Sequence, residues 1–182
     1  ERLIPAFVDA LSTEIALASR ASGAGRRVVR SIFFGGGTPS LLIAAQFETI
    51  LRTITDHFVV LPEAEITLEA NPNDIDLAYC RDLRSLGLNR ISLGMQSVNA
   101  NELRLFARRH DNDAVARAVS AARMGGFDNL NLDLIYGIPH QTLESWQTTL
   151  NAAVALSPDH LSLYGLGLED GTPMKDWGLR GG

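Results

Sequence analysis

Apolar residues recur along this chain with two alternating periods, one typical of helices and one typical of strands. Helical spacing, bounded by glycine and proline stops, predicts helices over residues 3–22, 44–58, 75–86, 101–107, 111–124 and 143–156. Short runs rich in β-branched and aromatic residues predict strands over residues 28–34, 65–70, 90–96, 130–136 and 160–164.

Strand and helix alternate five times without a hairpin signal. This order predicts an α/β fold of parallel strands joined by right-handed crossovers, either a β/α barrel or a doubly wound sheet. A hydrophobic content of 46% over 182 residues supports one core, so we expect a single domain over 1–182. The glycine-rich end, about residues 170–182, is expected to be an irregular tail.

A glycine turn follows the first predicted strand directly. Gly35, Gly36 and Gly37 allow a sharp bend and a close approach to a ligand, because they have no Cβ. Thr38 is a candidate N-cap, and Pro39 suits the first turn of a helix. Backbone N–H groups in such a turn can bind a carboxylate or a phosphate. On this motif alone, a ligand cradle and a plain tight turn are equally good interpretations.

Polar side chains recur at the carboxyl ends of the predicted strands. Glu69 and Gln96 lie at the ends of the second and third strands, and Asp133 lies in the apolar fourth strand. Arg108 follows the next short helix, within Arg-Arg-His (108–110). Taken alone, each carboxylate also has a structural interpretation, in which neighbouring backbone or an arginine satisfies it. Together they predict a polar ligand site at the edge where β/α folds bind ligands.

Composition excludes several classes of function. A net charge of −5 without a basic block argues against nucleic acid, and no apolar run reaches the roughly 20 residues of a membrane span. No signal-peptide pattern opens the chain. Cys80, the single cysteine, points to a reducing cytoplasm and is expected to be a small buried hydrophobe rather than a metal ligand.

Six motifs then occur in a fixed order. They are Phe-Phe-Gly-Gly-Gly-Thr-Pro-Ser (33–40), Leu-Glu-Ala-Asn-Pro (68–72), Ile-Ser-Leu-Gly-Met-Gln-Ser (91–97), Arg-Arg-His (108–110), Asn-Leu-Asp-Leu-Ile-Tyr-Gly-Ile-Pro (131–139) and Leu-Ser-Leu-Tyr (161–164). Together they resemble the oxygen-independent coproporphyrinogen III oxidase family of radical S-adenosylmethionine (SAM) proteins. Leu-Glu-Ala-Asn-Pro, Gln-Ser and Arg-x-His resemble its heme chaperone branch, whereas the oxidase branch tends to have Gln-Asp and Arg-Glu-Gln.

The resemblance implies a partial, TIM-like (β/α)6 barrel of parallel strands with S-adenosyl-L-methionine and a [4Fe–4S] cluster at the carboxyl-end rim. In that family, a first strand and a Cys-x3-Cys-x2-Cys loop precede the opening helix, and neither occurs in these 182 residues. We therefore expect an internal fragment, truncated at both ends. By itself it is expected to bind no cluster and to perform no radical chemistry.

The resemblance also implies site residues. Gly35, Gly36, Gly37 and Thr38 match the backbone cradle for the methionine part of SAM. Positions that contact SAM in the family are matched by Glu69, Gln96, Arg108 and Asp133. At the last strand Gly167 replaces the usual threonine, so only a backbone contact is expected there.

Three functions remain open. The first is a heme chaperone that binds heme and SAM and passes heme to a respiratory protein. The second is an oxidase that decarboxylates two propionates of coproporphyrinogen III through a radical and yields protoporphyrinogen IX. The third, a β/α barrel that binds a phosphate without a cluster, explains the glycine turn but not the other five motifs.

Overall fold

The computed structural model describes residues 2–21, 23, 25–106, 112–167 and 170. Its helices are α1 (Ile4–Ala21), α2 (Ala44–His57), α3 (Leu77–Ser85), α4 (Ala100–Leu105), α5 (Asn112–Met124) and α6 (Leu143–Ala155). Its strands are β1 (Val28–Phe34), β2 (Val59–Ala70), β3 (Arg90–Gln96), β4 (Asn129–Tyr136) and β5 (His160–Gly165). Two short 3-10 helices, η1 (Pro39–Leu41) and η2 (Pro72–Asp74), follow β1 and β2.

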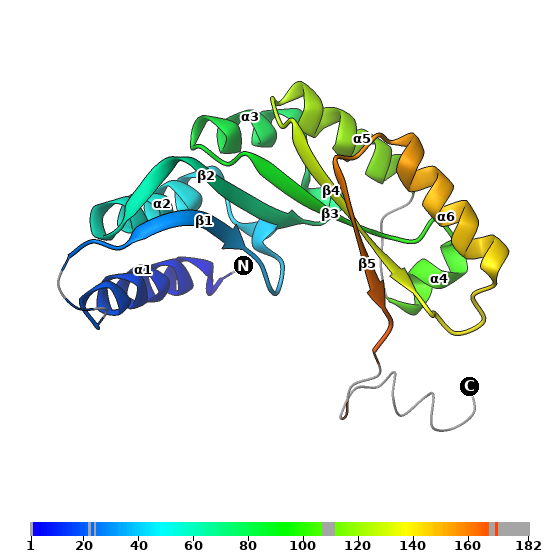
Figure 1. Cartoon of the computed structure of the whole chain (residues 1–182), viewed down its shortest axis with the longest axis horizontal. Coiled ribbons are helices and arrows are strands. Elements are labelled where there is room, and N and C mark those ends of the chain that lie inside the picture. Colours follow the sequence, from blue (N-terminus) through cyan, green and yellow to red (C-terminus); the bar gives the residue numbers. More distant parts are fainter. Residues whose placement is uncertain (1, 22, 24, 107–111, 168–169, 171–182) are drawn as a thin grey trace.

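The strands form one parallel sheet in the order β1-β2-β3-β4-β5. Figure 1 shows that this sheet curls into part of a barrel, with α3, α5 and α6 along its outer side. The α/β class and the parallel strands expected from the sequence are confirmed. Five strands lie in the described residues, whereas the resemblance implied a barrel of six.

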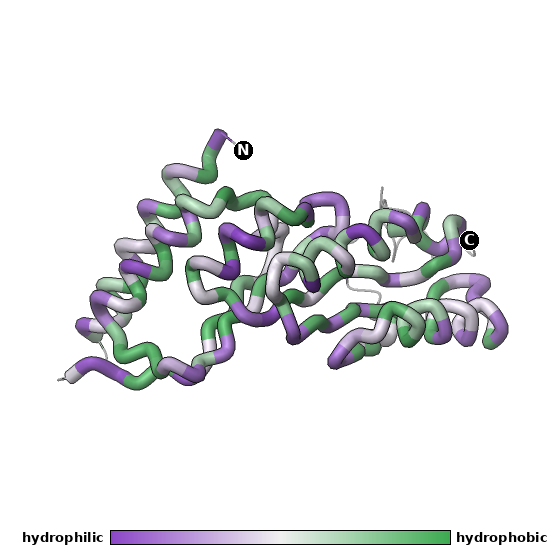
Figure 2. The backbone as a smooth tube through the Cα atoms, turned by 90° about the horizontal axis from the view of Figure 1, so that it is seen from above, coloured by the Kyte–Doolittle hydropathy of each residue, from purple (hydrophilic) through white to green (hydrophobic). Residues whose placement is uncertain are grey.

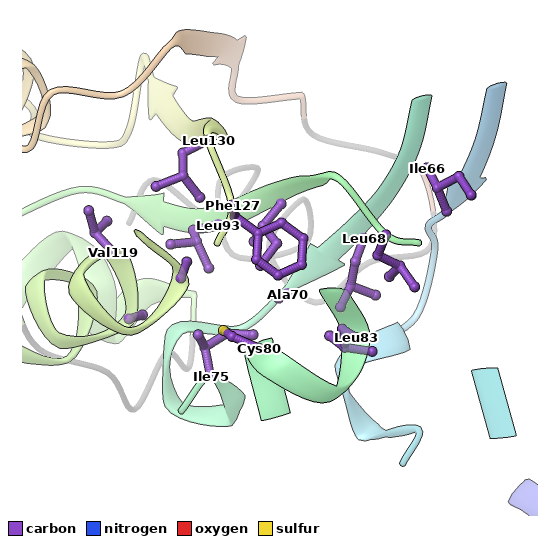
Figure 3. Packing of buried hydrophobic residues seen from close by; sticks show 14 of the residues in the cluster. Ile66, Leu68, Ala70, Ile75, Cys80, Leu83, Leu93, Val119, Phe127 and Leu130 are labelled. Atoms are coloured by element: carbon purple, nitrogen blue, oxygen red, sulfur yellow. The ribbon is translucent and has the colours of Figure 1, made fainter. Parts of the chain in front are cut away.

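The hydrophobic core lies between the sheet and these helices. Leu68 and Leu93 project from β2 and β3 toward Cys80 and Leu83 of α3, and Phe127 packs beside them (Figure 3). Seen from above, polar and apolar residues are interspersed along the backbone (Figure 2). Cys80 is fully buried, as expected of a small hydrophobe. Among the helices of the described ranges, none combines the length and hydropathy of a membrane span.

The second strand was predicted too short. It begins at Val59 rather than at Glu65, and Val59 pairs with Val28 of β1. Val29 of β1 pairs with Val60, and the next pair joins Ser31 to Glu65. Between these pairs β2 has three more residues than β1, and the extra residues form a bulge. Pro62 lies in that bulge, where the N–H that proline lacks is not needed. Pro62 and two glutamates interrupt the apolar pattern, which is why the sequence pattern missed this half of the strand.

The predicted starts of two helical segments, α3 and η1, can be compared with the structure. The helix expected from Ile75 begins at Leu77, because Pro72–Asp74 forms η2 and the Asp76 carboxylate caps α3 by accepting from the Tyr79 N–H at 2.8 Å. Thr38 occupies the N-cap position of η1, directly before Pro39, as expected, but its side chain makes no capping hydrogen bond.

Candidate functional site

The concave face of the sheet is polar. Because side chains alternate along a strand, each strand sends one set to the helices and the other to the inside of the curl. In β/α barrels the inner layers are usually filled by Val, Ile and Leu. Here the inner set includes Thr67, Glu69, Ser92, Gln96, Asn131, Asp133 and Ser162. This face therefore suits a polar ligand rather than an apolar filling.

A cleft of about 300 Å³ opens at the carboxyl end of the sheet. It brings together residues from five segments that are distant in sequence: Gly37, Thr38, Glu69, Gln96, Asp133 and Tyr164. Five of these six were expected as site residues from the sequence. Tyr164 was recognised only as part of a motif, and its position on the concave side of β5 places it here.

The glycine turn packs directly on Glu69. The Gly36 N–H donates to Glu69 Oε2 at 3.0 Å. A Cβ on Gly35 would lie 2.4 Å from Phe33 Cε1 and 3.2 Å from Glu69 Cδ, so a larger residue fits there only if the exposed Phe33 ring moves. Gly36 and Gly37 have φ values of 76° and 45°, which favour glycine. The turn thus binds a carboxylate of the protein itself, and Glu69 is the link between the turn and β2.

Asp133 is held at both carboxylate oxygens. Oδ2 accepts from Ser92 Oγ at 2.9 Å, and Oδ1 accepts from Asn131 Nδ2 at 2.7 Å. Asn131 is almost fully buried, and its Oδ1 contacts His160 Nδ1 and accepts from Ser162 Oγ at 3.1 Å. Since Oδ1 only accepts, His160 donates from a protonated Nδ1. These bonds fix the direction in which Asp133 presents its charge.

Sequence reasoning missed the residues that support Asp133. Ser92 and Asn131 appear in the sequence analysis only inside motifs, and His160 is not singled out there. The period of a strand was the available signal. Asn131 lies two residues before Asp133 and therefore faces the same side, and Ser92 shares that face on the neighbouring strand.

Gln96 has an unusual backbone. Its φ of 63° lies in the left-handed region, and the Ser97 N–H donates to the Met95 carbonyl at 2.8 Å, closing a tight turn around it. A Cβ on Gly94 would lie 2.8 Å from Gln96 Nε2, so the Gln96 amide folds back over Gly94. The turn directs a neutral amide, only 7% exposed, to the edge of the cleft.

Hydrogen bonds to η2 and α3 hold the segment that follows the glycine turn, residues 40–42. Ser40 Oγ donates to Asp74 Oδ2 at 2.6 Å, and the Tyr79 hydroxyl donates to the Leu42 carbonyl at 2.7 Å. Burial, with a smaller contribution from Asp74, raises the pKa of the Tyr79 phenol well above its usual value. Tyr79 therefore stays protonated and keeps this hydrogen bond in place.

Four of the expected residues are not part of the described cleft. Gly35 and Gly36 belong to the turn beside Glu69 but do not line the cleft, and the other two are Arg108 and Gly167. Arg108 lies outside the described residues. Gly167 is described, but it does not line the cleft. The residues that do line it include two carboxylates, Glu69 and Asp133, and no lysine or arginine. Two carboxylates among amides and hydroxyls suit a ligand that carries positive charge and hydroxyl groups.

Comparison with known proteins identifies the family and the fold of this chain. The sequence profile of the radical SAM superfamily matches residues 11–153. The chain belongs to the radical SAM superfamily. This confirms what the six motifs implied, and SAM and a [4Fe–4S] cluster are the cofactors of this superfamily.

The relatives extend well beyond this chain. The chain is 37% identical over 175 residues to the heme chaperone HemW of Synechocystis sp., which covers 96% of this chain and 42% of that protein. It is 38% identical to the oxygen-independent coproporphyrinogen III oxidase of Escherichia coli, over 87% of this chain and 34% of that protein. The structure of the Escherichia coli oxidase superposes with a TM-score of 0.82 at 32% identity, over 98% of this chain and 44% of that one. The chain thus spans less than half the length of these relatives.

The residues present fit one cofactor of the superfamily and not the other. The cleft offers acceptors and an amide that suit the ammonium and ribose hydroxyls of SAM. The cluster needs several thiolates, whereas Cys80 is the only cysteine and is buried. The described residues also contain no cluster of three His, Cys, Asp or Glu side chains able to hold a metal. These 182 residues therefore do not supply the thiolates that such a cluster needs.

Proposed function

We propose that this chain is the SAM-binding core of a heme chaperone, which binds heme and delivers it to an acceptor protein such as a respiratory one. The observation that carries the proposal is the convergence of the glycine turn, Glu69, Gln96 and Asp133 on one cleft at the carboxyl end of the sheet. When bound, SAM supplies the superfamily's radical chemistry. The single cysteine and the role in heme delivery support a cytoplasmic location.

Each cleft residue has a role that its chemistry allows. Glu69 and Asp133 accept hydrogen bonds from the SAM ammonium and ribose hydroxyls, and the Gln96 amide donates to a ligand oxygen. The backbone of the Gly35–Gly37 turn cradles the methionine part, apart from the Gly36 N–H, which donates to Glu69. Arg108 is proposed to pair with the methionine carboxylate, and Gly167 to make a backbone contact.

Ser97 supports the chaperone over the oxidase. The chaperone branch has Gln-Ser where the oxidase branch tends to have Gln-Asp, and here Ser97 is 1% exposed. Its hydroxyl donates to Glu102 Oε2 at 2.5 Å. An aspartate at position 97 would bring two carboxylates together in a buried place, which is strongly unfavourable. The buried Glu102 carboxylate therefore favours serine over aspartate at position 97. Several of the relatives are themselves named heme chaperones.

Calorimetric titration with SAM tests the site. We expect Glu69→Gln and Asp133→Asn each to weaken binding by about tenfold, because each replaces a charge-assisted hydrogen bond worth about 1.5–3 kcal/mol with a neutral one. Glu48→Gln, on the exposed face of α2, is the control and should bind like the unaltered chain. Equal affinity in all four proteins would contradict the assignment of this cleft.

A second experiment separates the chaperone from the oxidase. It uses a protein that joins this chain to the segments its relatives carry on either side, with the cluster reconstituted anaerobically. We expect stable heme binding and no decarboxylated product from coproporphyrinogen III with SAM and a reductant. Turnover to protoporphyrinogen IX would assign the oxidase instead.

A further inference from the structure

Gln96 needs support to keep its conformation. A left-handed backbone is unfavourable for a residue with a Cβ, and the closed turn from Met95 to Ser97 is a strained one. Such a conformation persists only where the surrounding structure enforces it. The enforcing contacts lie on the far side of the turn from the cleft, at Ser97.

Ser97 is anchored to a buried carboxylate. Its hydroxyl donates to Glu102 Oε2 at 2.5 Å and accepts from the Asn99 N–H at 2.9 Å. Glu102 lies in the first turn of α4 and is only 4% exposed. The Val98 N–H donates to Thr149 Oγ1 at 3.3 Å, so the backbone after Gln96 is held at successive residues.

Glu102 also ties this turn to α6 and to the loop before it. Its Oε1 accepts from Ser145 Oγ at 2.5 Å, and its Oε2 accepts from Gln141 Nε2 at 3.1 Å. Gln141 Oε1 in turn accepts from the Gly137 N–H at 2.9 Å. Removing the carboxylate would leave three buried or half-buried donors without their acceptor, which is costly. Glu102 is therefore the centre of a network joining the ends of β3 and β4.

We infer that Ser97 and Glu102 are positioning residues that hold Gln96 in its left-handed turn and so aim its amide into the cleft. Neither side chain lines the cleft, so both act through Gln96 rather than on a ligand. The inference rests on the proposed function for the identity of the ligand, SAM. The geometry it describes exists without the ligand and is testable separately.

Amide hydrogen exchange of the ligand-free 182-residue chain tests the geometry. In Glu102→Gln and in Ser97→Ala we expect the Ser97 N–H to exchange at least about tenfold faster, because the turn that it closes loses its anchor. Leu93, in the middle of β3, is the internal reference and should be unchanged. Glu144→Gln, exposed in the first turn of α6, is the matched control. The inference would be overturned if the Leu93 and Ser97 amides exchanged faster by the same factor, or if the exchange rate of the Ser97 amide did not change.

A double-mutant cycle tests the action through Gln96. SAM affinity is measured for Glu102→Gln, Gln96→Ala and the double variant. We expect Glu102→Gln to weaken binding about fivefold alone and not at all in the Gln96→Ala background, since its target is then gone. If the double variant instead loses SAM affinity by the product of the two single-variant losses, the inference is overturned. An unaltered chain that binds no SAM would overturn the proposed function instead, and the exchange rates would still decide whether Glu102 holds the turn.

Discussion

Gln96 and Cys80 each occupy a position that restricts the residue types the chain can tolerate there. At Gln96 the restriction is on the backbone, because its φ of 63° suits glycine better than any residue with a Cβ. At Cys80 it is on size and polarity, because the side chain is fully buried. Both effects are measurable in the free energy of unfolding.

The left-handed backbone predicts an inverted order of stability at position 96. Gln96→Gly should be more stable than Gln96→Ala by about 1 kcal/mol, since only alanine keeps the left-handed strain. At Gln147, inside α6, alanine should instead be more stable than glycine by about 0.5–1 kcal/mol. Urea denaturation of the four variants measures both differences. Alanine being the more stable residue at both positions would contradict the strain at Gln96.

The buried thiol predicts a loss of stability in alkali. Burial, with a smaller contribution from Asp76, raises the pKa of Cys80 from 9.0 to about 11. Because the folded pKa lies above the unfolded one, this contribution is complete below pH 9 and is lost as the pH rises toward 11. The stability difference between the unaltered chain and Cys80→Ala should therefore shrink between pH 8 and pH 10.5. A stability difference between the two proteins that stays constant from pH 8 to pH 10.5 would contradict the raised pKa of Cys80.

Asp159 joins three elements at the amino end of the sheet. Its Oδ2 accepts from the Leu130 N–H of β4 at 2.9 Å and from Arg123 Nη2 of α5 at 2.8 Å, and it directly precedes β5. The hydrogen bond from the Leu130 N–H, followed by the Arg123 guanidinium, lowers the pKa of this carboxyl. Because Asp159 is largely exposed, the contribution to stability is small.

This lowered pKa predicts a loss of stability in acid. The contribution of Asp159 is present above its unfolded pKa of 3.8 and is lost as the pH falls through the folded value. Asp159→Asn should thus destabilise the chain by up to about 1 kcal/mol at pH 7 and by less at pH 3, measured by urea denaturation. Asp56→Asn, on the exposed side of α2, should change stability by less than about 0.5 kcal/mol. An Asp159→Asn effect as large at pH 3 would contradict the prediction.

The sequence predicted the bounds of some helices and strands more accurately than those of others. Helices α2, α5 and α6 follow apolar periodicity closely, and their predicted bounds agree with the structure to within a few residues. The first half of β2 was not predicted as a strand, because a bulge breaks the strand period and places Pro62 between paired segments. Pairing with β1, a contact between residues about 30 apart, decides that this segment is a strand.

The whole molecule presents a cleft built from five segments and no cluster ligands of its own. We therefore predict that these 182 residues, reconstituted anaerobically with iron and sulfide, form no [4Fe–4S] cluster, because their single cysteine is buried. Absorption and electron paramagnetic resonance spectra measure this, and Cys80→Ala should give the same spectra. Cluster signals that disappear in Cys80→Ala would contradict the prediction.

The sequence by itself determined the parallel α/β class, the glycine turn and the presence of Glu69, Gln96 and Asp133 at or near strand ends, because periodicity and short motifs can be read from neighbouring residues. Only the tertiary structure decided how those residues are held. The Glu69 carboxylate occupies the Gly36 N–H, and Asn131 and Ser92 hold Asp133. Such hydrogen bonds cross between strands and depend on register and curl, which no local pattern specifies.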